Sequence, residues 1–284
     1  MCVKFYRSCF LKQNVSYLTL VKRKSQRGAY MNYSIKTNQG KRKDNQDFTG
    51  TFFNQENVLL AILCDGLGGH QAGDIASEMA VSQIGNAWEQ TDFSGTDLYM
   101  IQRWLQDKIN EENTRISEAA STYADLEGMG TTLVATALLD RYIIFANIGD
   151  SRAYVFKDEV VRLVTEDHSF VSELKRQGGI TDDEAKNHLI KNALTRSLGV
   201  TGPIEIDFFR EERKMVDYVM LNSDGLSNVV SKDLMLEIFK QDNSIETKAN
   251  ELIEAALNND ASDNITVNII DVHKKYEQQA GENK

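Results

Sequence analysis

Three aspartate–glycine pairs, each at the end of a short apolar stretch, are the residues best suited to chemistry. They are Asp65-Gly66, Gly149-Asp150 and Asp224-Gly225. Asp263 stands directly before the last apolar stretch, and Asp47 stands at the start of an early one. A single pair of this kind is the ordinary composition of a turn. Several carboxylates gathered at one end of a fold would repel one another and would need cations to stay ionised.

The type of ligand predicts the type of ion. An all-oxygen ligand set favours Mg²⁺ or Mn²⁺, and no cysteines and histidines stand at the spacing of a zinc site. Two divalent ions would neutralise the charge of −4 carried by Asp47, Asp65, Asp224 and Asp263. A phosphate group would then need one more cation, and the planar guanidinium of Arg42 suits phosphate oxygens. Two metals about 3.5–4 Å apart can activate a bridging water for in-line attack on phosphorus.

The stretch around Asp65 carries the strongest local pattern. The apolar run 58–64 is short and continuous, which predicts a strand buried on both faces. Gly66, Gly68 and Gly69 allow a tight turn with exposed carbonyls, so we expect the Gly66 carbonyl to hold a metal beside Asp65. The alternative is a plain Asp-Gly turn between a strand and a helix.

The order of elements predicts the fold class. Helices are expected at 71–90, 96–121, 231–241 and 244–258, and strands at 32–37, 48–53, 58–64, 130–139, 142–148, 153–156, 160–164, 204–210, 218–221 and 265–272. The polar segment 165–203, with short helices at 169–177 and 181–188, is interpreted as an inserted flap. Hairpins and helices in separate blocks predict an α+β sandwich of two sheets between helix pairs.

Composition bounds the function. The chain has 284 residues, 41% hydrophobic and 26% charged, as in a soluble globular protein, and no run of 18 apolar residues for a membrane span. Three cysteines, Cys2, Cys9 and Cys64, make no disulfide framework, which fits a reducing cytoplasm. Residues 31–284 carry 25 basic and 42 acidic residues, a charge of −17, so we expect no nucleic-acid binding.

The two ends differ from the rest. Residues 1–30 carry seven basic residues and no acidic one. They could form a targeting arm or a signal peptide, but we favour a start at Met31, directly before the first strand. We expect this extension to be poorly ordered and residues 274–284 to form a polar tail.

Eight short motifs occur in one order between residues 32 and 272. They are R-K-D-N-Q-D (42–47), D-G-L-G-G-H-x-x-G-x-x-A-S (65–77), G-M-G-T-T (128–132), I-G-D-S-R (148–152), T-E-D-H-S (165–169), T-R-S-L-G (195–199), L-N-S-D-G-L (221–226) and S-D-N-I-T (262–266). Each motif alone is weak. In this order they resemble the metal-dependent protein phosphatases of the PPM or type 2C family, most of all the small bacterial members.

The resemblance implies a domain at 31–273 with a four-layer α-β-β-α sandwich. It implies hydrolysis of phosphoserine and phosphothreonine in proteins, opposite a Ser/Thr kinase, by a monomeric cytoplasmic enzyme. Two Mn²⁺ or Mg²⁺ ions, with a third weaker one at Asp150, would be held by Asp47, Asp65, Gly66, Asp150, Asp224 and Asp263. Asp65 would bridge two metals, and Arg42 would bind phosphate. His70 would give a proton to the leaving oxygen, or would instead cap a helix or contact the flap.

Some details depart from the family. Gly40 and Arg42 are two residues apart where three are usual, so Lys41 or Lys43 could share the phosphate role. Gln46 stands where many eukaryotic members have an acid. We assign the remaining histidines to the flap surface and the tail: His168, His188 and His273. The alternatives are a silent member acting as a binding module, and a two-metal phosphodiesterase or nuclease, which the acidic charge disfavours.

Overall fold

The computed structural model describes residues 32–68, 72–181, 184, 188–190 and 193–272. The expected N-terminal extension at 1–30, the tail at 274–284, His70 and His273 lie outside the described residues. Most of the helix expected at 181–188 does so as well.

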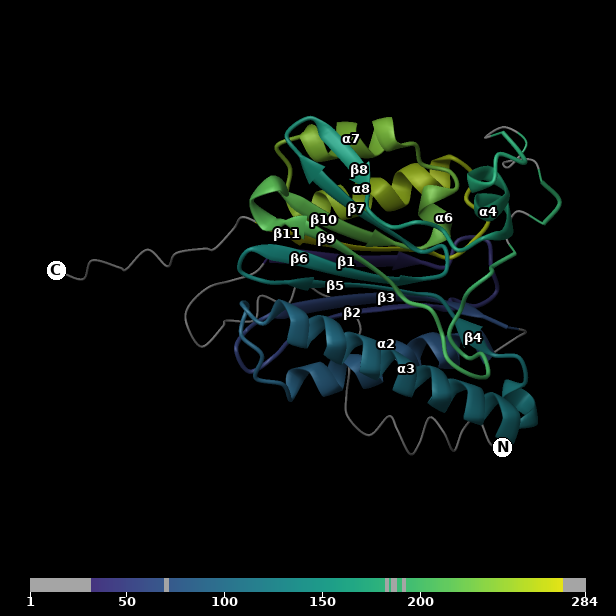
Figure 1. The fold of residues 1–284 in the computed structure, drawn as a ribbon. Coiled ribbons are helices and arrows are strands. Elements are labelled where there is room, and N and C mark those ends of the chain that lie inside the picture. The colour runs from purple at the N-terminus through teal and green to yellow at the C-terminus, as the bar shows by residue number, and fades with distance from the viewer. Residues whose placement is uncertain (1–31, 69–71, 182–183, 185–187, 191–192, 273–284) are drawn as a thin grey trace.

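Two antiparallel sheets form the middle of the molecule (Figure 1). One sheet has the order β1-β11-β10-β7-β8, with β1 Asn32–Asn38, β11 Ile265–Asp271, β10 Tyr218–Asn222, β7 Arg152–Lys157 and β8 Val160–Leu163. The other has the order β2-β3-β5-β6-β9, with β2 Asp47–Phe53, β3 Leu59–Leu67, β5 Leu133–Leu138, β6 Tyr142–Ile148 and β9 Asp207–Glu212. A short strand, β4 Gly130–Thr131, pairs with the end of β3.

Helix pairs cover the two outer faces, as Figure 1 shows. α2 Ala72–Glu89 and α3 Leu98–Thr122 lie on the sheet of β3, and α7 Lys232–Lys240 and α8 Ile245–Asn258 lie on the sheet of β11. Short helices are α4 Phe170–Arg176, α6 Asp224–Ser227 and the 3₁₀ turns η1 Ala124–Leu126 and η2 Arg213–Met215. The predicted four-layer α+β sandwich is thus confirmed. None of the helices in the described ranges has the length and apolar character needed to cross a bilayer.

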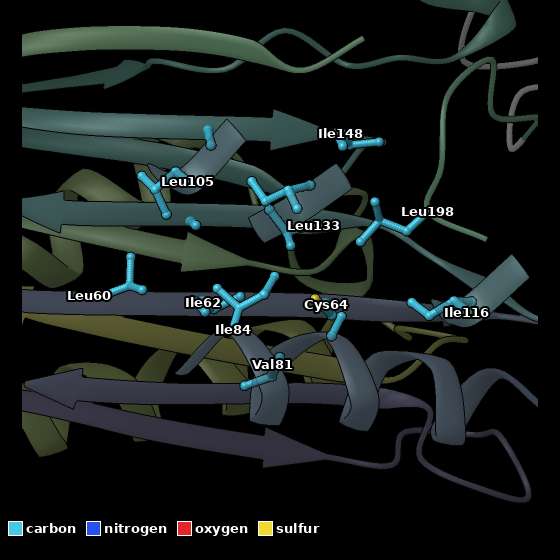
Figure 2. Packing of buried hydrophobic residues seen from close by; sticks show 14 of the residues in the cluster. Leu60, Ile62, Cys64, Val81, Ile84, Leu105, Ile116, Leu133, Ile148 and Leu198 are labelled. Atoms are coloured by element: carbon cyan, nitrogen blue, oxygen red, sulfur yellow. The ribbon is translucent and has the colours of Figure 1, made fainter. Parts of the chain in front are cut away.

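β3 shows why the sandwich forms. Its side chains alternate between two apolar cores, because successive residues of a strand point to opposite faces. Leu60, Ile62 and Cys64 pack toward α2 and α3, where they join Val81 and Ile84 (Figure 2). The intervening residues, Leu59, Ala61 and Leu63, pack between the two sheets. The strand is therefore buried on both faces, as its continuous apolar run predicted.

The structure corrects two expected strands. The run at 130–139 is split into β4 and β5 because the backbone and side chain of Thr132 bond to Asp65 in place of the ladder. The strand expected at 204–210 is β9 at Asp207–Glu212. The segment before it is held to α3, where the amide of Asn113 bonds the backbone of Gly199, Val200 and Gly202.

We expect Asn113→Ala to lower the free energy of unfolding by roughly 2–4 kcal/mol, because it removes the four hydrogen bonds of a buried side chain that hold the segment 199–202 to α3. The Asn113 side chain is 2% exposed and makes four hydrogen bonds of 2.9–3.2 Å. Urea denaturation measures the loss. Asn110→Ala on the same helix is the control, since the Asn110 amide donates only to the carbonyl of Gln106 in its own helix. Equal effects of the two substitutions would contradict this role of Asn113.

Candidate metal centre

Asp47 and Asp65 are direct cross-strand neighbours. β2 and β3 pair in a register that sets Asp47 opposite Asp65. Asp65 continues the row of Leu59, Ala61 and Leu63, so it lies on the face of β3 that looks toward the second sheet. The apolar row between the sheets therefore ends in a pair of carboxylates.

Two threonines hold the backbone of Asp65: Thr131, the last residue of β4, and Thr132, which follows it. The Asp65 carbonyl accepts from the hydroxyl of Thr131 and from the backbone N–H of Thr132, both at 2.9 Å. The Asp65 N–H donates to the hydroxyl of Thr132 at 2.9 Å, and that hydroxyl lies 2.7 Å from the hydroxyl of Ser151. Ser151 directly follows Asp150, so one hydroxyl pair connects two of the three Asp-Gly corners.

Gly66 and Gly225 are required by close packing of backbone. A Cβ on Gly66 would stand 2.2 Å from the carbonyl oxygen of Gly73 in the first turn of α2. A Cβ on Gly225 would stand 2.0 Å from the carbonyl oxygen of Asn264. Both distances are below any van der Waals contact, so a side chain at either position would force the loops apart.

Asn264 holds the loop of Arg42 to the last strand. Its side-chain amide donates to the carbonyls of Gln39 and Asp44, and its side-chain oxygen accepts from the N–H of Gln46, all at 2.9 Å. Asp263, the neighbouring residue, is brought to the same loop. The sequence marks Asn264 only as one member of the motif S-D-N-I-T (262–266).

Arg42 reaches Asp263. Its Nη2 donates to the Oδ2 of Asp263 at 2.6 Å, across 221 positions of sequence. Lys41, one of the two lysines considered for the same role, pairs instead with Asp260. The Arg42 side chain is 58% exposed, so the guanidinium has further donors available at the edge of the carboxylate cluster.

Two carboxylate oxygens of this aspartate cluster are buried without a hydrogen-bond donor. Asp47 accepts from the hydroxyl of Ser223 through Oδ2 at 2.7 Å, and Asp224 accepts from the amide of Asn228 through Oδ2 at 3.0 Å. The Oδ1 atoms of both residues have no hydrogen-bond partner. Buried polar atoms of this kind are rare, and carboxylate oxygens are the type of ligand that suits a hard cation.

The carboxyls resist ionisation. Burial and then the charges of Asp47, Asp224, Asp150 and Asp263 hold the pKa of Asp65 well above its usual range. Burial likewise raises the pKa of Asp47 to about 7, with a contribution from Asp224 and Asp263.

The carboxyls of the other two Asp-Gly corners, Asp150 and Asp224, also have a raised pKa. Burial and the charge of Asp224 raise the pKa of Asp150 to about 7, and burial and the charge of Asp263 raise that of Asp224 to about 6. Divalent cations would reverse these shifts, so the donor set fits the group that the sequence predicted. Within the described ranges, however, no three of the His, Cys, Asp and Glu side chains already stand as a complete ligand set. Asp263 in particular is paired with Arg42.

Asp150 stands between two residues that the flap holds in place. Gly149 donates its N–H to Nδ1 of His168 at 3.1 Å and accepts from the His168 N–H at 2.9 Å. Arg152 makes two hydrogen bonds to the carboxylate of Asp167, at 2.9 and 2.6 Å. Two consecutive residues at the start of the flap therefore fix both flanks of Asp150.

The assignment of His168 to the flap surface was wrong. Its side chain is 2% exposed. Because Nδ1 accepts from Gly149, Nε2 carries the proton and donates to Oδ2 of Asp207 at 2.9 Å. Arg196 donates to Oδ1 of the same aspartate at 2.8 Å. The only sequence signal for this cluster was the position of T-E-D-H-S and T-R-S-L-G around the flap.

Comparison with known proteins gives the family. A sequence model described as "Protein phosphatase 2C" matches residues 36–259. A putative protein phosphatase 2C-type of Streptococcus pyogenes is 42% identical over 241 residues, which is 84% of this chain and 97% of that protein. The serine/threonine phosphatase stp of Listeria monocytogenes is 42% identical over 242 residues, 85% of this chain and 96% of that protein.

Solved structures of serine/threonine phosphatases have the same fold as this chain. The serine/threonine phosphatase of S. agalactiae superposes with a TM-score of 0.81 at 40% identity, covering 85% of this chain and 99% of that one. The catalytic domain of the phosphatase PstP, solved in complex with two manganese ions, superposes with a TM-score of 0.72 at 30% identity, covering 85% and 97%. The chain belongs to the protein phosphatase 2C family, which confirms the resemblance found in the motifs.

We expect Asp65→Asn to stabilise the metal-free protein at pH 8. Carboxyls with a raised pKa hold more protons in the folded than in the unfolded chain between about pH 4 and 7, so the free energy of unfolding falls as the pH rises through that range. Removing one charge should raise the melting temperature by about 3–6 °C per pKa unit relieved. Thermal scans with EDTA at pH 5 and pH 8 measure the effect.

Asp44→Asn, which removes an exposed carboxylate from the Arg42 loop, is the control and should leave the melting temperature unchanged. Mn²⁺ should stabilise the wild type more at pH 8 than at pH 5, since protons compete with the metal. A metal-free Asp65→Asn protein that melts below the wild type at pH 8 would show that the carboxylates do not repel one another.

Proposed function

We propose that this chain, a protein serine/threonine phosphatase, hydrolyses phosphoserine and phosphothreonine monoesters with a water activated between two divalent metal ions. The observation that carries the proposal is the end of the sandwich where five aspartates converge beside one exposed guanidinium. Such a site attracts divalent cations and, once they are bound, a phosphate dianion.

Asp65 is the proposed bridging ligand. Its pKa is the one that is raised by the charges of all four other aspartates, which places it centrally among them. Gly66, whose backbone is packed against Gly73, would present its carbonyl to the first metal. Asp224 and Asp263 would hold the second, and Asp47, fixed by Ser223, would act beside them.

The bound metals would supply a hydroxide and neutralise the negative charge that develops on phosphorus and its oxygens. The protein's own groups orient the substrate. Arg42 would turn from Asp263 to the phosphate oxygens, for which its two-pronged donor geometry is suited. His70 is proposed as the proton donor to the leaving oxygen, although it lies outside the described residues.

Mn²⁺ and Mg²⁺ both fit an all-oxygen site, and the manganese in PstP favours Mn²⁺ as the first ion to test. A third, weaker ion is proposed at Asp150, whose flanks are fixed while its own carboxyl stays half-buried.

The proposed substrates are phosphorylated proteins, and the proposed partner is the Ser/Thr kinase that makes them. We further propose a monomeric enzyme of the cytoplasm that binds no nucleic acid. A catalytically silent binding module is disfavoured because the acidic ligands and Arg42 are all present and gathered at one end of the fold.

The purified protein should release phosphate from a phosphothreonine peptide with Mn²⁺ and lose that activity in EDTA. Asp65→Asn should lower turnover by at least ~100-fold, since it removes the shared ligand of both metals. Malachite-green phosphate release is the measurement, and Asp44→Asn is the active control. Activity that survives both chelation and Asp65→Asn would disprove the mechanism. Preferential cleavage of bis-p-nitrophenyl phosphate would indicate a diesterase instead.

Asp150→Ala should reduce turnover by about tenfold while two manganese ions still bind, because only the third ion depends on it. Isothermal titration with Mn²⁺ counts the ions, and single-substrate kinetics give kcat. Equal loss of all manganese binding would rule out a separate third site.

A further inference from the structure

A groove with a volume of about 720 Å³ lies beside the metal centre. Its walls are the last turns of α3, the loop 124–130 after it, and the segment 197–201 where the chain leaves the flap. Nothing in the proposed hydrolysis of a phosphate monoester uses this groove.

The groove begins at the metal-binding strand. Leu67 lines it, and Leu67 is one residue beyond Gly66 and pairs with Gly130 of β4, which also lines it. A chain in extended conformation covers about 3.3 Å per residue. A polypeptide whose phosphorylated side chain reaches Asp65 and Gly66 can therefore place residues a few positions away into the groove.

Its outer wall is rigid. Leu198 exchanges two backbone hydrogen bonds with Thr131, of 3.2 and 2.8 Å, and its side chain is buried in the core near Ile116 (Figure 2). Asn113 holds Gly199 and Val200 from the other side. Because Thr131 and Asn113 hold this wall in the absence of a ligand, less conformational entropy is lost when a ligand binds.

The lining is chemically specific. It carries hydroxyl groups of five side chains, Ser117, Ser121, Thr122, Ser197 and Thr201, together with three glycines. Glu127 is the one charged residue among those that line it, and it is exposed. Hydroxyls and open backbone suit a polar peptide, and a single carboxylate favours a cationic side chain over an anionic one.

Resting on the proposed phosphatase activity, we propose that this groove is a substrate subsite that binds residues flanking the phosphorylated Ser or Thr, with Glu127 selecting a basic side chain there. The acidic charge of −17 on residues 31–284 acts in the same direction at long range. Glu127 is thus a specificity-determining residue and takes no part in the chemical step.

The test compares three substrates in the full-length Mn²⁺-loaded enzyme. The first is an arginine set of phosphothreonine peptides, with arginine at positions two to four before or after the phosphothreonine. The second is a glutamine set, in which glutamine replaces each of these arginines. The third substrate, p-nitrophenyl phosphate, has no flanking residues. The wild type should have a higher kcat/KM for the arginine set than for the glutamine set when these residues stand on the side of the phosphothreonine that enters the groove. Glu127→Arg should lower kcat/KM for that set by about 3–10-fold, as expected for reversing one exposed charge contact, and leave p-nitrophenyl phosphate unchanged.

A second pair of variants tests the groove by volume. Ser121→Trp should lower kcat/KM for both peptide sets and not for p-nitrophenyl phosphate, because it fills the groove from an exposed position of α3. Glu118→Arg and Glu118→Trp are the matched controls at an exposed position of the same helix outside the lining, and should change nothing.

Two results would overturn the subsite. One is a Glu127→Arg enzyme that treats arginine and glutamine peptides as the wild type does. The other is an equal effect of the Glu118 and Glu127 substitutions, which would show a general effect of charge. Failure of the wild type to hydrolyse p-nitrophenyl phosphate as well as the peptides is a different outcome, since it would refute the proposed activity itself.

Discussion

Repulsion between carboxylates is the constraint on which the rest of this structure depends. Asp47, Asp65, Asp150, Asp224 and Asp263 come from separate segments of the chain, and four of them have a raised pKa because burial and neighbouring charges oppose ionisation. Only a frame stabilised elsewhere can hold such groups together. Three apolar cores, one between the sheets and one beneath each helix pair, provide that frame. Metal binding would turn the repulsion into attraction, so the energy stored in the fold becomes affinity for cations.

The backbone around the site is held by neutral groups and not by further charges. Thr131 and Thr132 bond both the N–H and the carbonyl of Asp65, and Asn264 bonds three positions of the loop that carries Arg42. Neutral donors fix position without competing for the metals or quenching the charge of the carboxylates. The third corner is the exception, since His168 bonds Gly149 while Asp167 forms an ion pair with Arg152, two residues after Asp150. A displacement of Asp167 and His168 at the start of the flap would thus change the position of Asp150 more directly than that of Asp65.

The sequence predicted the layers and the corners because these depend on local pattern. The apolar run of β3 and the helical spacing of apolar residues in α2 and α8 can each be recognised within one short stretch of sequence. It could not predict that Thr132 would interrupt a strand or that His168 would be buried. Both outcomes depend on partners far away in sequence, Asp65 in one case and Gly149 with Asp207 in the other. The groove of Glu127 was missed for the same reason, because its walls come together only through Asn113 and Leu198.

The pairing of Asp47 with Asp65 has a consequence for how the length of the chain can change. Side chains alternate along a strand, so a shift of β2 by one residue would turn Asp47 to the outer face and bring a neighbour into its place. A gain or loss of a single residue within the paired length of β2 would therefore move Asp47 off this face, and the connection to β3 is fixed by the buried side chain of Asn54, which accepts from the N–H groups of Glu56 and Val58. The flap at 165–203 does not set the register of this strand pair, so its length can change by one residue without moving Asp47. Insertions and deletions should accumulate there, and the two segments should evolve at different rates.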